Sequence, residues 1–116
     1  MDVQYSPAIR SLASRFKQLE AITPKLKTAV DVMADPSVHA EWDLVFDALG
    51  QELYRLTLHD DTDQVSTDFT AFELGIPLHM TVRLHRLCGD LLQIRSDKQH
   101  ATTRQLMAQI AASGEM

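Results

Sequence analysis

Residues 59–66 contain a histidine and three aspartates, and this segment is the first place to look for a metal site. Asp61 and Asp63 have the spacing of the first two ligands of a calcium loop. Val65 stands at the third ligand position and no glycine follows it. His59 with an aspartate is an alternative transition-metal pair. A solvated turn whose acids cap the next helix explains the segment better, so we expect no metal and no cofactor.

The other residues capable of catalysis are dispersed. The five histidines, His39, His59, His79, His85 and His100, form no pair with the spacing of a metal-binding helix, and no phosphate loop or nucleophile elbow occurs. His39 and Asp43 are four residues apart, which indicates a surface hydrogen bond more readily than a general base. Trp42 and Phe46 could form an aromatic site, but their spacing favours core packing. We predict that the protein is not an enzyme.

Residues 67–87 have features of a helix-turn-helix DNA-binding unit. Ala71, Gly75 and Ile76 fit its turn, whereas Thr81 stands where a branched apolar residue is typical. Arg83, Arg86 and His79 would lie on the solvent side of the second helix, where they could contact phosphates. The strongly acidic stretch that precedes the unit would repel DNA. DNA binding is therefore the alternative hypothesis and not the first.

Composition indicates one domain, residues 1–116, that needs no metal or disulfide to fold. Hydrophobic residues make up 45% of the chain and charged residues 23%, which is ordinary for a soluble globular protein. No apolar run approaches the roughly 20 residues of a membrane span. The N-terminal residues resemble neither a secretory signal nor a transit peptide, so we expect a cytoplasmic protein.

Charge is distributed unevenly along the chain. Residues 1–30 carry five basic and two acidic groups, residues 31–73 one basic and eleven acidic, and residues 74–116 five basic and three acidic. The net charges are therefore +3, −10 and +2. We expect the acidic and basic segments to pair within the fold, and a basic partner is the alternative.

Apolar residues recur at helical spacing through most of the chain, and Ser6-Pro7, Thr23-Pro24, Asp35-Pro36 and Pro77 look like helix starts. The pattern predicts helices at residues 7–21, 23–34, 36–58, 66–74, 77–95 and 97–112, with the main loop at 59–66. The expected fold is all-α, a bundle of four to six helices in which helix 36–58 packs on helix 77–95.

The predicted helix 77–95 has an apolar arc of roughly 160°, more than one packed neighbour hides. We therefore expect a homodimer, with Leu84, Leu87 and Leu91 in the dimer interface. Phe69 and Phe72 on the neighbouring short helix would be partner-binding residues, together with the acids Asp43 and Asp47. These features favour a function in protein–protein binding.

In size, acidic charge and helix layout the chain resembles the bacterial quorum-sensing anti-activators, which bind LuxR-type receptors and block their action. The resemblance covers this plan and no motif, so it assigns no functional residue. It implies a small regulatory protein that sequesters a transcription factor. Helical secretion chaperones and anti-sigma proteins share the plan, and a secretion chaperone is a further alternative.

Overall fold

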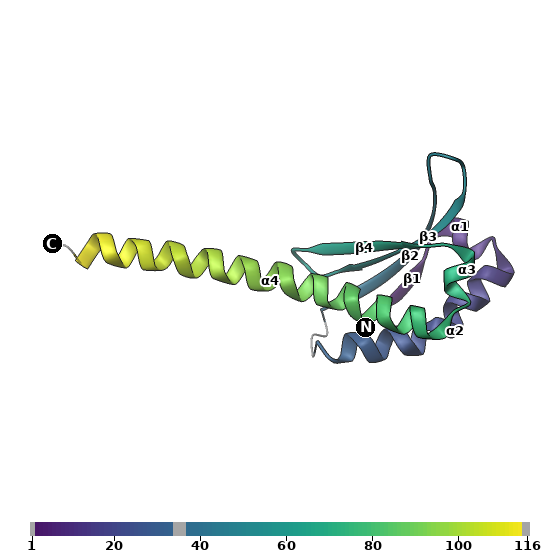
Figure 1. Cartoon of the computed structure of the whole chain (residues 1–116), viewed down its shortest axis with the longest axis horizontal. Coiled ribbons are helices and arrows are strands. Elements are labelled where there is room, and N and C mark those ends of the chain that lie inside the picture. The colour runs from purple at the N-terminus through teal and green to yellow at the C-terminus, as the bar shows by residue number, and fades with distance from the viewer. Residues whose placement is uncertain (1, 34–36, 115–116) are drawn as a thin grey trace.

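A computed structural model describes residues 2–33 and 37–114, and it contains a four-stranded sheet with helices on one face (Figure 1). The elements are β1 (Val3–Tyr5), α1 (Pro7–Arg10), α2 (Ala13–Asp31), β2 (His39–Phe46), β3 (Glu52–His59), β4 (Gln64–Phe69), α3 (Ala71–Leu74) and α4 (Pro77–Gly114). Helices make up 57% of the structure and strands 24%. The fold is α+β, and the prediction of an all-α bundle is wrong.

The predicted helix 36–58 is a β-hairpin, although its start at Pro36 lies outside the described residues. In β2, Ala40 and Trp42 are buried while Glu41 and Asp43 are exposed, and β3 alternates in the same way. Side chains of a strand point to opposite faces in turn, so this alternation places one apolar face on the core. Gly50, with a φ of 79°, lies in the turn that joins the two strands.

The sheet has the strand order β1-β2-β3-β4. β1 runs parallel to β2, and the other two pairs are antiparallel. Trp42 pairs with Leu56, which pairs in turn with Thr67, so the buried face continues from strand to strand. The opposite face carries the ladder of Asp43, Arg55 and Asp68, in which Arg55 Nε donates to Asp68 Oδ1 over 2.8 Å.

The first helical region is divided differently from the prediction. Ser6 caps α1 and Pro7 is its first residue, as expected, but α1 is one turn long. α2 then continues through Pro24, where two helices were predicted. Pro24 has no amide hydrogen, so it loses one helical hydrogen bond. Ile22 and Leu26 are buried in the core on either side of it, and this burial compensates for that loss.

α4 begins at Pro77 as predicted and is 38 residues long. Its first half packs on α2 and the sheet through Met80, Leu84, Leu87 and Leu91. No break occurs at Ser96, where a new helix was predicted, and the second half extends away from the sheet (Figure 1). The molecule is therefore elongated, with a longest dimension of 68 Å.

The predicted loop 59–66 and short helix 66–74 are replaced by a tight turn at residues 60–63, β4 and the one-turn helix α3. Thr70 Oγ1 accepts a hydrogen bond from the Glu73 amide, and Glu73 Oε1 accepts one from the Thr70 amide. This reciprocal cap explains why the strand changes to a helix at that point. Among the described residues, no helix combines the length and apolarity needed to cross a membrane.

Candidate functional site

The residues predicted for a dimer interface lie inside the chain's own core. Leu84, Leu87 and Leu91 are at most 2% exposed and face the sheet and α2. Their burial is therefore explained without a second copy.

The predicted partner-binding residues are separated by the fold. Phe69 is buried against Trp42, with ring centroids 5.9 Å apart, whereas Phe72 on α3 is 79% exposed. Asp43 lies on the open face of the sheet. Asp47 accepts hydrogen bonds from the amides of Leu49 and Gln51 and so holds the β2–β3 turn. Of the four, Phe72 and Asp43 are accessible side chains.

The acids at residues 60–63 hold a turn. Asp60 accepts hydrogen bonds from the amides of Thr62 and Asp63, and its other oxygen accepts from Arg95. These bonds, first those from the two amides and then that from Arg95, hold the pKa of Asp60 well below its usual range. Asp63 pairs with Lys98, so the turn is fastened to α4 by two ion pairs.

The histidines are only partly brought together. His39 and His59 face each other across β2 and β3, with ring centroids 5.6 Å apart, beside a hollow of about 390 Å³. His39 Nδ1 lies 4.0 Å from an oxygen of Asp2. No group of three histidine, cysteine, aspartate or glutamate side chains in the described part of the chain has the geometry to hold a metal ion.

Both Arg83 and His79 contact Glu73. The sequence predicted that these two residues would contact phosphates if the protein binds DNA. Glu73 Oε2 lies 2.9 Å from Arg83 Nη1 and 2.8 Å from His79 Nε2. Arg83 also donates to Thr67 Oγ1 and to the Asp68 carbonyl, and it stacks over the Phe69 ring. The amide of Thr70, and after it the contacts with His79 and Arg83, lower the pKa of Glu73. The cluster joins α3, β4 and α4, which is a structural role.

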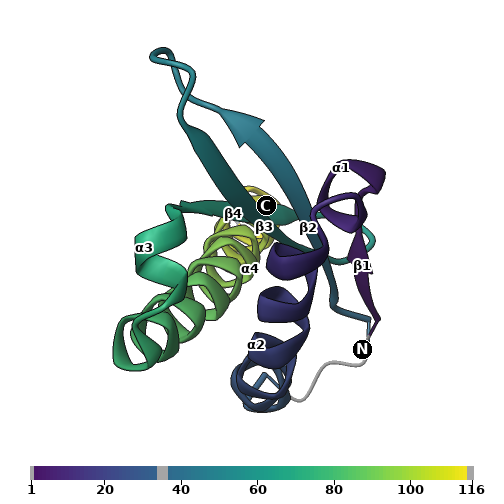
Figure 2. The same ribbon diagram turned by 90° about the vertical axis from the view of Figure 1, so that its right-hand side faces the viewer.

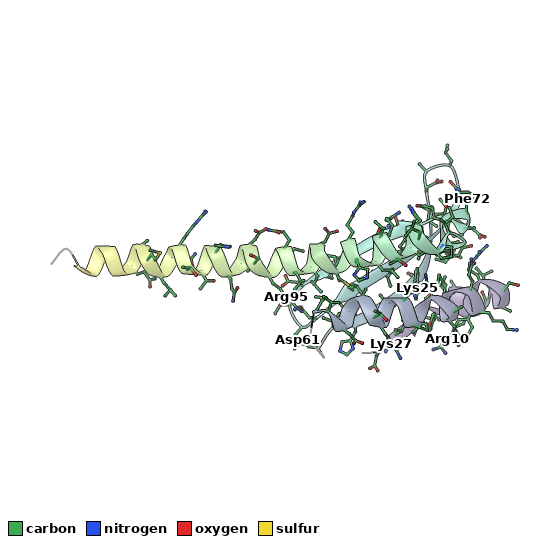
Figure 3. The ribbon with its side chains drawn as sticks, turned by 60° about the horizontal axis from the view of Figure 1, so that its bottom comes forward. Arg10, Lys25, Lys27, Asp61, Phe72 and Arg95 are labelled. Atoms are coloured by element: carbon green, nitrogen blue, oxygen red, sulfur yellow. The ribbon has the colours of Figure 1, made fainter. Side chains whose placement is uncertain are left out.

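Large apolar side chains are exposed at the opposite end of the molecule from the C-terminus. This end, called here the hairpin end, consists of the β2–β3 turn, the N-terminal turn of α2 and α3, and Figure 2 looks directly onto it. Phe46 is 61% exposed, Leu49 95% and Phe72 79%. Figure 3 shows Phe72 at this end of the molecule, far from Arg95 and Asp61 near the β3–β4 turn. Exposed apolar side chains of this size gathered at one end are typical of an interaction surface.

The hairpin end also contains a pocket between α2 and β3. It has a volume of about 230 Å³ and is lined by Leu12, Ala13, Ser14, Arg15, Glu52 and Tyr54. The Arg15 guanidinium lies over the Tyr54 ring, 4.9 Å from its centroid, and donates to Gln18 Oε1. Its Nε is buried and has no hydrogen-bond partner in the described structure. An unpaired buried donor of this kind gains free energy when an acceptor reaches it.

Tyr54 forms the floor of the pocket, and its hydroxyl donates to Glu52 Oε2 over 3.0 Å. Burial, followed by the hydrogen bond to Glu52, raises the pKa of Tyr54, and Arg15 partly opposes this shift. Tyr54 therefore remains a neutral donor at neutral pH, and Glu52 remains occupied as its acceptor. The pocket presents one cationic donor, Arg15, beside apolar surface.

Arg15 and Tyr54 were missed as pocket residues because no local sequence pattern brings α2 next to β3. Phe46 and Leu49 were missed as surface residues because both fall within the predicted helix 36–58. The signal that would have found them is the segment Asp47 to Gly50, in which an aspartate and a glycine bracket a turn between two stretches of alternating polarity.

Comparisons of the chain with models of protein families, with curated proteins and with solved structures find no match. The functional argument therefore rests on the residues of the hairpin end.

Proposed function

We propose that this chain is a non-enzymatic regulatory protein that acts, in the cytoplasm, by binding a segment of another protein at the hairpin end. One observation carries the proposal: Phe46, Leu49 and Phe72 are exposed at the same end of the molecule as a pocket that holds an unpaired arginine donor. Apolar anchors beside a few polar groups are the usual composition of a protein-binding surface.

The chemistry of the pocket defines the expected partner segment. An apolar side chain of the partner would pack against Tyr54 and Leu12, and a neighbouring carboxylate or carbonyl oxygen would accept a hydrogen bond from the Arg15 guanidinium. Hydrogen bonds to a charged group are stronger than neutral ones, so a carboxylate is favoured. A partner segment with an acidic residue next to an apolar one fits best.

DNA binding has less support from the same geometry. The first helix of the predicted helix-turn-helix unit is the one-turn α3, and Arg83 is held by Glu73, Thr67 and Asp68 instead of pointing to solvent. Binding at the hairpin end is compatible with two roles. The protein could sequester a transcription factor, or it could act as a chaperone that binds a secreted protein.

Affinity capture from a native lysate, with wild-type protein and two variants as bait, tests the proposal. Phe72→Ser should reduce the recovery of the specific partner at least about tenfold, the effect of losing one interface anchor. Val32→Ser is the matched control, because Val32 is 74% exposed and lies at the far end of α2. Equal recovery by both variants would contradict the proposal.

A further inference from the structure

The second half of α4 exposes its described side chains to solvent, and its Lys98 forms an ion pair with Asp63. From Asp97 to Gln109 every residue is exposed, and this part of the helix projects beyond the sheet (Figure 1). Side chains along this half stand free of the other elements in Figure 3. A helix of this length is only marginally stable in water when it is isolated. The C-terminal half, residues 97–114, continues α4 beyond the part that packs on the core, and it is called the tail from here on.

A continuous uncharged stripe runs along the solvent side of the whole helix. Its positions start at residue 78 and alternate in steps of four and three residues to 106, the spacing of a coiled-coil seam. Four positions are apolar and accessible: Leu78, Val82, Leu92 and Leu106. The five between them are His85, Gly89, Ser96, Gln99 and Thr103, none of which is Asp, Glu, Lys or Arg. This seam lies on the opposite side of α4 from Leu84 and Leu91, so it is free while the core stays intact.

We propose that the seam is covered by the α4 helix of a second copy, lying antiparallel, so that each tail packs on the first half of the other α4. In the register centred on residue 94, Val82 faces Leu106 of the second copy and Leu92 faces its Ser96. Gly89 faces Gln99 of the second copy. A Cβ added at Gly89 would meet no atom within 4 Å, so the position is open to a larger side chain from outside.

The distribution of residues along the seam favours the antiparallel arrangement. The first half of the seam contains Leu78, Val82 and Leu92, whereas the tail contains Gln99 and Thr103 before Leu106. A parallel pair would place two polar tail segments against each other and two apolar segments against each other elsewhere. In the antiparallel pair, Leu106 of the tail instead packs against Val82 of the other copy and Ser96 against its Leu92, while Gln99 and Thr103 face Gly89 and His85.

The length of the helix is sufficient for a stable interface. Thirty-eight residues span about 57 Å at 1.5 Å per residue. Two helices in contact over most of that length bury an area on the order of the 1,200–2,000 Å² found in specific interfaces. Phe46, Leu49 and Phe72 of the hairpin end are not seam positions, although the tail of the second copy would end beside the first turn of α4, next to α3.

Sedimentation of the full chain tests the self-association. We expect a dimer at about 10 μM, a range suited to moderate self-affinity. Leu106→Glu should raise the dimer dissociation constant about 100-fold or more, because both copies would bury a charge. Ala108→Glu is the matched control on the opposite side of the tail and should leave the dissociation constant unchanged. A monomeric wild-type protein, or equal effects of the two variants, would overturn the proposal.

Cysteine crosslinking tests the direction of the pair. Val82→Cys and Leu106→Cys variants mixed under oxidising conditions should form a disulfide between the two variants, and neither variant alone should crosslink. Wild-type protein is the control for Cys88, which is buried. Crosslinking of Val82→Cys with itself would show a parallel pair and overturn the proposed register. If the tail instead binds an unrelated protein, the two variants should not crosslink when mixed. That result would also overturn the proposed dimer.

Discussion

Arg83 on α4 and Glu73 on α3 form an ion pair, with 2.9 Å between Nη1 and Oε2, and both side chains are at most 25% exposed. The same guanidinium lies 4.6 Å from the centroid of Phe69 and donates to the carbonyl of Asp68. One side chain therefore connects the end of β4, the short helix α3 and the long helix. Together with the Thr70–Glu73 cap, this contact holds α3, and with it Phe72, at the hairpin end.

Replacement of Arg83 should destabilise the fold. Arg83→Met retains the apolar stem and leaves Glu73 without its arginine partner, so the free energy of unfolding should fall by about 1–3 kcal/mol. Urea unfolding followed by circular dichroism measures the change as a lower midpoint with an unchanged slope. Arg86→Met, three residues further along α4 at an exposed position, is the control. An equal effect of the two substitutions would mean that Arg83 has no special structural role.

Low pH should weaken the ion pairs that link the β3–β4 turn to α4. The pKa of Asp60 is lower in the folded protein than in the unfolded chain, so its contribution to stability is present above about pH 4 and is lost as the pH falls toward the folded value. Asp60→Asn keeps an acceptor for the turn amides and removes the charge that pairs with Arg95. This variant should lose less stability between about pH 5 and pH 2.5 than wild type does.

Thermal unfolding at a series of pH values measures that difference. Asp61→Asn, at the exposed neighbouring position, should follow the wild-type curve. If Asp60→Asn instead followed the wild-type curve, the charge of Asp60 would not contribute to acid sensitivity.

Tyr54 should ionise above the ordinary tyrosine value. Its pKa is raised by burial and by Glu52, so the stability it contributes is present below pH 10 and is lost as the pH rises through the folded pKa. The ultraviolet absorbance of tyrosinate should show a late titration, above the ordinary tyrosine pKa, in the wild-type protein. Tyr54→Phe should remove the late titration and Tyr5→Phe should retain it. A late titration that survives in Tyr54→Phe would contradict the placement of Tyr54 in the pocket.

Leu84 should behave as a core residue and not as an interface residue. Leu84→Ala leaves a cavity beneath α4 and should reduce the free energy of unfolding by about 2–5 kcal/mol. Its sedimentation at a temperature where it remains folded should match that of the wild type. A change in oligomeric state without a loss of stability would return Leu84 to the dimer interface predicted from sequence.

The sequence predicted the features that depend on local chemistry. Ser6 with Pro7, and Pro77, mark helix starts because a cap and a residue without an amide hydrogen act within one turn. The hairpin was missed because residues 38–58 satisfy two periodicities at once. Trp42, Leu49 and Leu56 recur at helical spacing, while Tyr54, Leu56 and Leu58 alternate as in a strand.

The choice between those periodicities depends on partners distant in sequence. β2 and β3 are stabilised by pairing with β1 and β4 and by the cover of α2 and α4, and none of these contacts is visible within a local window. The same reason applies to the hairpin end. Phe72 was predicted as an exposed partner-binding residue, whereas Arg15 and Tyr54 come together only because α2 packs over β3.

The central claim is that the hairpin end binds another protein, and site-specific photo-crosslinking in a native lysate tests it most directly. A photoreactive phenylalanine analogue would replace Phe72 in one sample, Phe46 in a second and the exposed Val32 in a third. We predict that positions 72 and 46 crosslink to the same protein, that Arg15→Gln reduces the yield of that adduct, and that position 32 does not form it. Absence of a shared adduct at positions 72 and 46, or an equal yield of it at position 32, would contradict the claim.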